Sequence, residues 1–540
     1  MLRQKPKIVI IGAGIAGLTA AKTLYTTTQK NSNELFDLCV VEGGNRIGGR
    51  ILTSEFNGDQ IELGATWIHG IEGNPIHKIA QEFNSFQSEK PWECKEGKLI
   101  DKSVTITEDG YQVNSSLVEY ISIFYNKMLE FCSGQQNFQD GVCRHILESL
   151  NLENGSTKNL SIGSYLKKGL NFFWDLKKDQ ENVQVFDNWS RKSLEEGVFT
   201  MFENIHRHDS SADDLGTLDF NGESEYCNFH GDEMTIAKGY LSVIESLASV
   251  LPDGLIQLCR KVTKIEWQSD LILENDDGGN GTKPVKLHFS DGSVMYADHV
   301  IVTVSLGVLK KGIRNNSAMF SPQLPSFKTE AISRLGFGVV DKLFLKLSSP
   351  STHDDNSMIF RYLQMVFHQS DSKLFHPKVP LWIRRTALIY PIYPNSSTIV
   401  SWFAGKEALE MESLDDEEII DGVSTTMSLF LANSKQFKNN SDSAAENRVK
   451  FSKILRCKWG SDPLFLGSYT YIAVGSSGDD LDAMAEPLPK RISKNCPPLQ
   501  ILFAGEATHR SCYSTTHGAY LTGLREANRL LKHFQCVDDV

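Results

Sequence analysis

"KIVIIGAGIAG", residues 7–17, is the stretch that decides the fold. Its first half is a run of apolar, mostly β-branched residues, which predicts a buried strand. Gly12, Gly14 and Gly17 then follow at G-x-G-x-x-G spacing. In this motif the first glycine allows a tight turn, the second lets backbone N–H groups approach a pyrophosphate, and the third lets the next helix pack closely. That helix is predicted over residues 18–25.

A second strand and an acidic residue complete this pattern. Residues 36–41 predict the neighbouring parallel strand, and Glu42 stands at its end, where a carboxylate can bind a ribose 2′-hydroxyl. The polar residues 26–33 lengthen the connection between helix and strand. The order of strand, turn, helix, strand and acid predicts an α/β, Rossmann-like fold that binds a dinucleotide. The alternative is an ordinary glycine turn in an α/β protein.

A second glycine-rich turn follows at once, in "VEGGNRIGGR", residues 41–50. Arg50 comes directly after Gly48 and Gly49, so its guanidinium could reach a pyrophosphate or the flavin end of a longer cofactor. A nicotinamide enzyme has no evident need for this addition, whereas FAD binds in an extended form along its whole length. The turn therefore favours FAD, and the alternative is a surface arginine.

The length, net charge and cysteine content of the chain restrict the class of protein. The chain has 540 residues, more than one hydrophobic core usually supports, which predicts two domains. Its formal net charge of −12 argues against a nucleic-acid partner and would suit a cationic ligand. The ten cysteines show no metal-type spacing, so we expect free thiols, a reducing compartment and no metal. Because no apolar stretch reaches the roughly 20 residues of a membrane span, we expect a cytoplasmic protein with no membrane partner. The sequence leaves the oligomeric state open.

Separated blocks of the chain have the pattern of one nucleotide-binding domain. Residues 262–267 and 285–304 are rich in strand formers, with the polar 275–281 as an expected hairpin connection, and residues 518–534 have helical spacing after the apolar start of 502–509. We expect the nucleotide-binding domain to comprise residues 1–85, 235–309 and 456–540. A substrate-binding domain is expected from residues 86–234 and 310–455.

Further motifs occur in a fixed order along the chain. They are "ELGATWIHG" (62–70), "VDKLFL" (340–345), "LGSYTY" (466–471), "FAGEATH" (503–509) and "YSTTHGAYLTGLREA" (513–527). Together with the two glycine-rich turns, they resemble the flavin-containing amine oxidases, specifically the polyamine oxidases, and most of all the plant cytosolic spermine/thermospermine oxidases. The resemblance extends from Lys7 to about Phe534. It implies an FAD-binding domain, an α+β substrate-binding domain, and a small cationic polyamine and O2 as substrates.

The resemblance also implies a reaction. A secondary amine of spermine or thermospermine would be oxidised to an imine with hydride transfer to flavin N5. Water would split the imine into spermidine and 3-aminopropanal, and O2 would be reduced to H2O2. The residues leave open which polyamine is preferred and which side of the nitrogen is oxidised.

Four residues are expected at the chemical centre. By resemblance, Lys342 holds a water against flavin N5, and His69 positions the amine. Tyr469 would stand near the flavin face and guide the amine by cation–π attraction. Thr515 occupies the position at which monoamine oxidases carry a second tyrosine. The first three have structural alternatives: a solvent-facing strand lysine, a satisfied loop histidine and a tyrosine in a half-buried strand. Thr515 instead argues against the monoamine branch.

The resemblance also supplies the cofactor contacts. The expected FAD-binding residues are Gly12, Gly14, Ala16, Gly17, Glu42, Arg50, Gly64, Ala65, Thr66, Trp67, Val262, Glu506, Thr515 and Thr516. The cysteine that binds flavin covalently in the monoamine branch would align with Ser468, so we expect non-covalent FAD. Gly43 and Ser305 depart from the usual alanine and proline of the family without removing a chemical group.

The stretch "SSADDLGTLDFNGESEY", residues 210–226, offers carboxylates for the distal amines, although such a run is more often a solvated loop. The candidates are Asp213, Asp214, Asp219, Glu223 and Glu225, and the alternative is a solvated acidic loop.

Other classes of protein remain open at this point. A flavin-dependent histone-lysine demethylase would share the flavin and lysine motifs, but no long charged helical hairpin is visible in the chain. A non-catalytic flavin-binding regulator would have no need of Lys342, His69 and Tyr469. A nicotinamide dehydrogenase would leave the "RIGGR" turn without a purpose.

Overall fold

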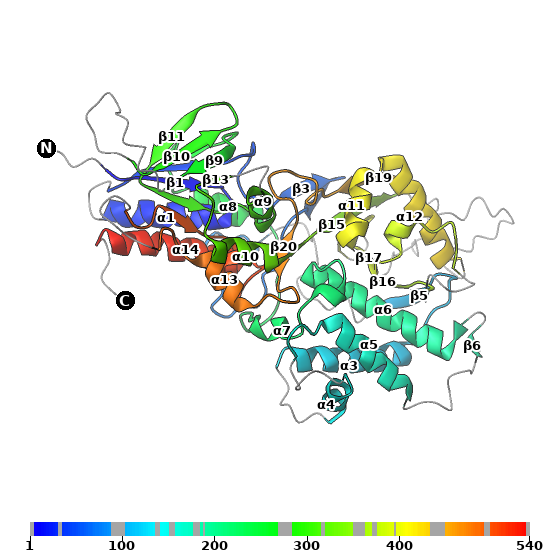
Figure 1. The fold of residues 1–540 in the computed structure, drawn as a ribbon. Coiled ribbons are helices and arrows are strands. Elements are labelled where there is room, and N and C mark those ends of the chain that lie inside the picture. Colours follow the sequence, from blue (N-terminus) through cyan, green and yellow to red (C-terminus); the bar gives the residue numbers. More distant parts are fainter. Residues whose placement is uncertain are drawn as a thin grey trace.

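The computed structural model describes most of the chain, in segments separated by gaps. These are residues 5–30, 35–87, 103–134, 141–150, 157–175, 184–186, 189–267, 283–314, 319–348, 362–369, 375–393, 396–432, 449–490 and 497–535. Figure 1 shows the described elements gathered around two main sheets, with the parallel sheet toward one end of the molecule and the α3–α6 group toward the other.

A parallel sheet brings distant parts of the chain side by side. In spatial order its described strands are β21 (Ile501–Phe503), β12 (His299–Val302), β1 (Lys7–Ile11), β2 (Asp37–Val41) and β8 (Ile256–Gln257). Within the sheet, Ile8 of β1 pairs with Leu38 on one side and His299 on the other. The apolar run of β1 is buried from Ile8 to Ile11, as expected for a strand covered on both faces.

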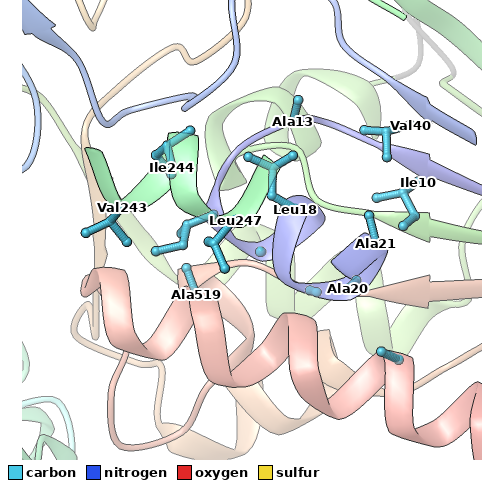
Figure 2. Packing of buried hydrophobic residues seen from close by; sticks show 14 of the residues in the cluster. Ile10, Ala13, Leu18, Ala20, Ala21, Val40, Val243, Ile244, Leu247 and Ala519 are labelled. Carbon is cyan, nitrogen blue, oxygen red and sulfur yellow. The ribbon is translucent and has the colours of Figure 1, made fainter. Parts of the chain in front are cut away.

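Helices cover one face of this sheet. Here α1 (Ile15–Lys30) packs along α14 (Thr516–His533), and α8 (Leu241–Ala248) lies beside both. In Figure 2, Ala20 of α1 and Ala519 of α14 place small side chains where these helices meet, whereas Ala21 points toward Ile10 of the sheet. At Gly523 of α14 a Cβ would lie 2.1 Å from the carbonyl oxygen of Ala16, so only glycine allows this close approach.

A smaller sheet and three helices cover the other face, where Val9 and Val41 are buried. In spatial order the strands of this sheet are β11 (Val294–Ala297), β10 (Val285–Phe289), β9 (Val262–Glu266) and β13 (Phe320–Ser321). The helices are α9 (Leu306–Gly312), α10 (Ser326–Arg334) and α13 (Gly478–Ala485).

A mixed sheet of six described strands is the second main sheet of the molecule. In spatial order they are β19 (Phe451–Arg456), β15 (Val340–Leu347), β18 (Thr398–Ala404), β17 (Leu388–Pro391), β16 (Leu363–Val366) and β5 (Val104–Thr107). Leu343 and Leu345 of β15 share a core with Met411 of α11 (Gly405–Ser413) and Val423 of α12 (Asp416–Phe430). Because side chains alternate along a strand, Lys342 and Phe344 lie on the opposite face.

The remaining elements connect these layers. The paired short strands are β3 (Thr53–Phe56) with β4 (Asp59–Glu62), β6 (Gln184–Phe186) with β7 (Trp189–Ser190), and β14 (Gly336–Gly338) with β20 (Tyr469–Tyr471). The remaining helices are α2 (Pro75–Glu82), α3 (Ser115–Cys132), α4 (Gly141–Glu148), α5 (Ile162–Asp175), α6 (Arg191–Ser210), η4 (Leu215–Thr217), α7 (Gly222–Glu225), η5 (Leu381–Ile383) and η6 (Glu506–Thr508).

The predicted α/β fold is confirmed, with the first strand, turn, helix and second strand in the expected order. The first helix is longer than predicted, because it begins at Ile15 inside the glycine motif. The expected hairpin connection at 275–281 lies outside the described residues. The partition of the chain into two domains stays a prediction. In the described part of the chain, none of the helices combines the length and apolar character needed to span a membrane.

Candidate active site

A cavity of about 760 Å³ connects the parallel sheet with the six-stranded sheet. At one end it is lined by Gly12 and Glu42, which follow the carboxyl ends of β1 and β2. At the other end it is lined by Tyr390 and Trp402 of the six-stranded sheet. Ligands of open parallel sheets bind beyond the carboxyl ends of the strands, so the cavity lies where the sequence predicts a nucleotide.

The first glycine turn has the expected geometry. Gly12 has φ +108°, a conformation that favours glycine, and its N–H donates to the carbonyl of Val41 at 2.8 Å. Gly12 and Gly14 line the cavity, whereas Gly17 does not. A Cβ at Gly17 would lie 2.0 Å from the carbonyl oxygen of Gly12. Gly17 therefore supports the turn by packing against it, and a direct contact between Gly17 and FAD stays a prediction.

The second glycine turn packs directly on the first. The N–H of Gly48 donates to the carbonyl of Ala13 at 2.9 Å, and Gly14 and Gly48 form a parallel bridge. Gly48 and Gly49 have φ +100° and +60°, and both line the cavity. The "RIGGR" sequence therefore extends the glycine floor of the cavity instead of forming an isolated surface turn.

Arg50 lies on the cavity wall and is not a free surface arginine. Its Nη1 donates to the carbonyl of Ser468 at 2.7 Å and to Oε1 of Glu506 at 3.0 Å. The buried Glu506 also accepts from Oγ1 of Thr470 at 3.1 Å and from the N–H of Ser514 at 3.1 Å. These bonds join three distant segments, and Nη2 and Nε of Arg50 have no hydrogen-bond partner among the described residues.

Glu42 is held beside the first turn. Its Oε2 accepts from the N–H of Ala13 at 2.8 Å, and its Oε1 accepts from the N–H of Gly44 at 2.7 Å. The carboxylate is therefore fixed where the pattern predicts the ribose of a dinucleotide.

The other predicted cofactor residues converge on the same cavity. Those that line it are Gly12, Gly14, Ala16, Glu42, Arg50, Gly64, Ala65, Thr66, Trp67, Val262, Glu506, Thr515 and Thr516. The two departures from the family pattern also lie here: Gly43 lines the wall, and Ser305 caps α9 by accepting from the N–H of Val308 at 3.1 Å. A long glycine floor, a carboxylate at one end and a partly unengaged guanidinium further along fit an extended dinucleotide such as FAD.

Lys342 points from β15 into the cavity and is almost completely buried. Its Nζ donates to the carbonyls of Glu62 at 2.8 Å and Gly64 at 2.9 Å, and it also contacts Oγ1 of Thr66. The ring of Trp402 lies 4.5 Å from Nζ. These partners compensate for burying an ammonium group, so the solvent-facing alternative for Lys342 is wrong. They also show that Thr66, predicted only as a cofactor contact, holds the lysine.

His69 lies on the cavity wall and has a charged partner that the sequence did not reveal. Its Nδ1 is 2.8 Å from Oε1 of Glu233, another lining residue. The hydrogen bond to His69 lowers the pKa of Glu233. The pair therefore combines an imidazole and a carboxylate at a wall that remains partly open to solvent.

Tyr469 and Thr515 both line the cavity. The hydroxyl of Tyr469 donates to the carbonyl of His208, and burial raises the pKa of this tyrosine. The hydroxyl of Thr515 donates to the carbonyl of Cys512 at 2.7 Å and accepts from the N–H of Gly518 at 2.9 Å. Thr515 is therefore the N-cap of α14, which is a structural role at a lining position.

The predicted acidic stretch contributes only one carboxylate, Glu223, to the cavity lining. Asp213 and Asp214 instead accept from the backbone N–H groups of Lys406 and Gly216. Asp219 accepts from the N–H of Asn221, and Glu225 forms an ion pair with Arg510 at 2.9 Å. These four candidates therefore do not line the described cavity, because turns and ion pairs in the fold engage their side chains.

Three further lining residues come from the end of α6 and were missed. They are His206, His208 and Asp209. Asp209 keeps an exposed side chain that lines the cavity, and the surrounding protein desolvates its carboxyl group enough to raise the pKa. A helical signal existed in the sequence, because residues three positions apart, such as His206 and Asp209, share one face of a helix.

This geometry defines a flavoenzyme site, and the chain belongs to the family of flavin-containing amine oxidoreductases, whose model matches residues 15–531. It is 53% identical to "Probable polyamine oxidase 5" of Arabidopsis thaliana, over 99% of this chain and 100% of the relative. It is 39% identical to "Polyamine oxidase 1" of Oryza sativa subsp. japonica, over 99% of both chains. A human "Peroxisomal N(1)-acetyl-spermine/spermidine oxidase" is 31% identical, over 97% of this chain and 95% of the relative.

Membership of this family makes the chain an FAD-dependent oxidase with a non-covalent cofactor. The absence of covalent attachment agrees with the residue at position 468. Ser468 is a serine, and its hydroxyl is engaged by the backbone N–H and carbonyl of Val340 at 2.8 and 2.9 Å.

Proposed function

We propose that this enzyme oxidises a polyamine at a secondary amine. The observation that carries this proposal is the composition of the cavity wall at the end of α6 and at α7. It contains two carboxyl groups, Asp209 and Glu223, and two imidazoles, His206 and His208, all able to accept hydrogen bonds from ammonium groups. A chain with several separated amines could engage these groups while one amine reaches the flavin.

The two carboxyl groups favour a cationic ligand. Burial raises the pKa of Asp209, and it raises the pKa of Glu223 to about 7. Each is therefore costly to ionise alone, and an ammonium group beside it would reduce that cost. The last turn of α6 adds the negative end of a helix dipole at the same place.

The two histidines are neutral acceptors. Burial lowers the pKa of His206, and burial followed by the charges of Arg207 and Arg385 lowers that of His208 to about 3. Neither ring nitrogen of His208 has a hydrogen-bond partner among the described residues. A neutral imidazole with a free nitrogen can accept a hydrogen bond from an ammonium group, whereas a charged one would repel it.

The residues nearer the predicted flavin position would orient the reacting amine. FAD, when bound, supplies the acceptor for the hydride removed from the carbon beside the amine. We propose that Lys342 organises the water that later splits the imine, with its ammonium fixed by Thr66 and the two carbonyls. His69, oriented by Glu233, would accept a hydrogen bond from the amine and favour its deprotonated form. Tyr469 would form an aromatic wall that excludes water.

The same reasoning leads to a specific substrate and specific products. We propose spermine or thermospermine as the substrate, spermidine and 3-aminopropanal as the products, and reduction of O2 to H2O2 in the cytoplasm. The names of the two plant relatives support a polyamine, and the four acceptors suit a substrate with several charges.

The decisive experiment mixes purified holoenzyme anaerobically with spermine, thermospermine, an acetylated polyamine and a methylated histone peptide. We expect loss of the oxidised-flavin absorbance with an unacetylated polyamine, and equal amounts of H2O2 and aldehyde after O2 is admitted. Flavin that remains oxidised with every polyamine would overturn the proposal. Reduction by the methylated peptide alone would point to the demethylase class.

A further inference from the structure

Two cysteines from distant parts of the chain meet beside residues that line the cavity. Cys227 is exposed, Cys512 is partly exposed, and both are free thiols. The N–H of Cys227 donates to the carbonyl of Ser511 at 2.8 Å, and Sγ of Cys512 lies 3.5 Å from the carbonyl oxygen of Cys227. A disulfide requires Cα atoms about 4.4–6.8 Å apart. The backbone hydrogen bond and the sulfur–carbonyl contact place the two residues side by side, as this bond needs.

The pair joins two segments that carry lining residues. Tyr226 and Asn228 flank Cys227, Tyr513 follows Cys512, and all three line the cavity. The rings of Tyr226 and Tyr513 meet edge to face with centroids 5.3 Å apart. A covalent link at the cysteines would therefore fix the relative position of two walls of the cavity.

We propose that Cys227 and Cys512 form a modification site at which a hydroperoxide, H2O2 in particular, produces an intramolecular disulfide. The thiolate of Cys227 attacks one oxygen of H2O2, which breaks the O–O bond and gives a sulfenic acid and hydroxide. The sulfur of Cys512 then attacks the sulfenic sulfur and displaces hydroxide, which takes up the thiol proton as water. In total, two thiols and one H2O2 give one disulfide and two waters.

The environments of the two thiols favour this order. Cys227 is exposed and meets a soluble oxidant first. Burial, and secondly the neighbouring Cys227, raises the pKa of Cys512 to about 11, so this sulfur remains a thiol while it awaits the sulfenic acid. Cys512 therefore acts as the resolving partner.

The proposed function enters only as one source of the oxidant. An oxidase that releases H2O2 through this cavity would expose its own wall to the product, and the disulfide would then restrict movement of the segments around residues 226–228 and 512–513. Added H2O2 can form the same bond when no polyamine is present.

The test treats reduced holoenzyme with H2O2 in the absence of polyamine, followed by alkylation and peptide mapping without reductant. We expect one linked peptide pair containing Cys227 and Cys512, with the loss of two hydrogen atoms, and its disappearance on adding dithiothreitol. Cys227→Ser and Cys512→Ser should each abolish the link. Cys259→Ser is the matched control, because Cys259 is also an exposed thiol. We expect it to leave the link intact.

A second measurement detects the link through its effect on unfolding. The bond closes a long loop, since the two cysteines are 285 residues apart in sequence, and should raise the midpoint of thermal unfolding by about 2–5 °C in the native-cysteine enzyme only. Overoxidation of Cys227 without a link, or a link that uses Cys259 instead, would overturn the inference. If polyamines yield no H2O2 but added H2O2 forms the link, the proposed function fails and this inference stands.

Discussion

Replacing Glu223 with glutamine tests the electrostatic basis of substrate binding. The change removes one charge and nearly preserves the shape of a residue that lines the cavity on α7. A carboxylate and an ammonium about 4 Å apart attract each other by about 4 kcal/mol at the effective dielectric constant of proteins. A glutamine carbonyl that still accepts a hydrogen bond would retain about 1 kcal/mol of this attraction. The expected net loss in binding free energy is therefore about 3 kcal/mol, or about 100-fold in KM, with kcat changed much less.

The pH dependence gives a sharper signature of the same charge. Because the pKa of Glu223 is raised to about 7, the carboxylate is ionised at pH 8 and mostly protonated at pH 6, so affinity for a cation falls as the pH falls. One pH unit below the pKa, only about one carboxylate in ten is ionised, so the affinity that its charge adds for the cationic substrate falls about tenfold. We expect Glu223→Gln to raise KM about 100-fold at pH 8 and only about 10-fold at pH 6.

The assay measures initial rates of H2O2 release across a polyamine concentration series at both pH values. Glu225→Gln is the matched control: Glu225 lies on the same helix but pairs with Arg510, which Asp479 and Asp482 also hold. The control should leave KM within about twofold of the native enzyme. A Glu223→Gln variant with native KM at pH 8, or with an unchanged ratio between the two pH values, would refute the reasoning.

The other predictions concern Lys342, Arg50 and Gly17. Lys342→Met should slow turnover by about 100-fold or more while FAD stays bound, because a positioned proton-transfer group contributes rate enhancements of that order. Stopped-flow measurements of flavin reduction and reoxidation will show which step slows. An undiminished rate would show that Lys342 takes no part in the chemistry. Arg50→Ala should weaken FAD retention about 10- to 100-fold, because it removes the link between Ser468 and Glu506. Retention is measured as the flavin that appears in the filtrate after dilution. Unchanged retention would show that Arg50 does not contribute to FAD binding. Gly17→Ala should lower thermal stability and FAD content together, because its Cβ would lie 2.0 Å from the carbonyl oxygen of Gly12. Gly141→Ala is the control for a glycine change as such, because no atom lies within 4 Å of its Cβ and its backbone is not in the left-handed region. Equal effects of the two variants would contradict this account.

The nucleotide turn was predictable from the sequence because its determinants are local. Gly12, Gly14 and Gly17 act within one strand, turn and helix, and the burial of β1 follows from its own apolar run. The direction of Lys342 could be anticipated only by resemblance. An isolated strand does not show which of its faces meets a cavity, and here the carbonyls of Glu62 and Gly64 from a distant hairpin decide it.

The substrate end was predicted poorly for a related reason. The sequence offered acidic candidates in 210–226 without deciding between a binding site and a solvated loop, and in the structure Asp214 caps a turn and Glu225 pairs with Arg510. Asp209 was missed because it directly precedes the expected stretch, at the end of a helix whose orientation depends on tertiary packing. The pairing of His69 with Glu233 likewise joins residues that sequence spacing does not relate.

The order of strands in the parallel sheet has a consequence for biosynthesis. The central strand β1 is synthesised before β21 and α14, from which it is separated by most of the described elements. The hydrogen bonds of Arg50 to Ser468 and Glu506 and the packing of α14 against α1 therefore cannot form until residues near 530 have emerged. Stable binding of FAD must then follow synthesis of these segments, and a nascent chain interrupted before β21 would lack both supports of the cofactor site.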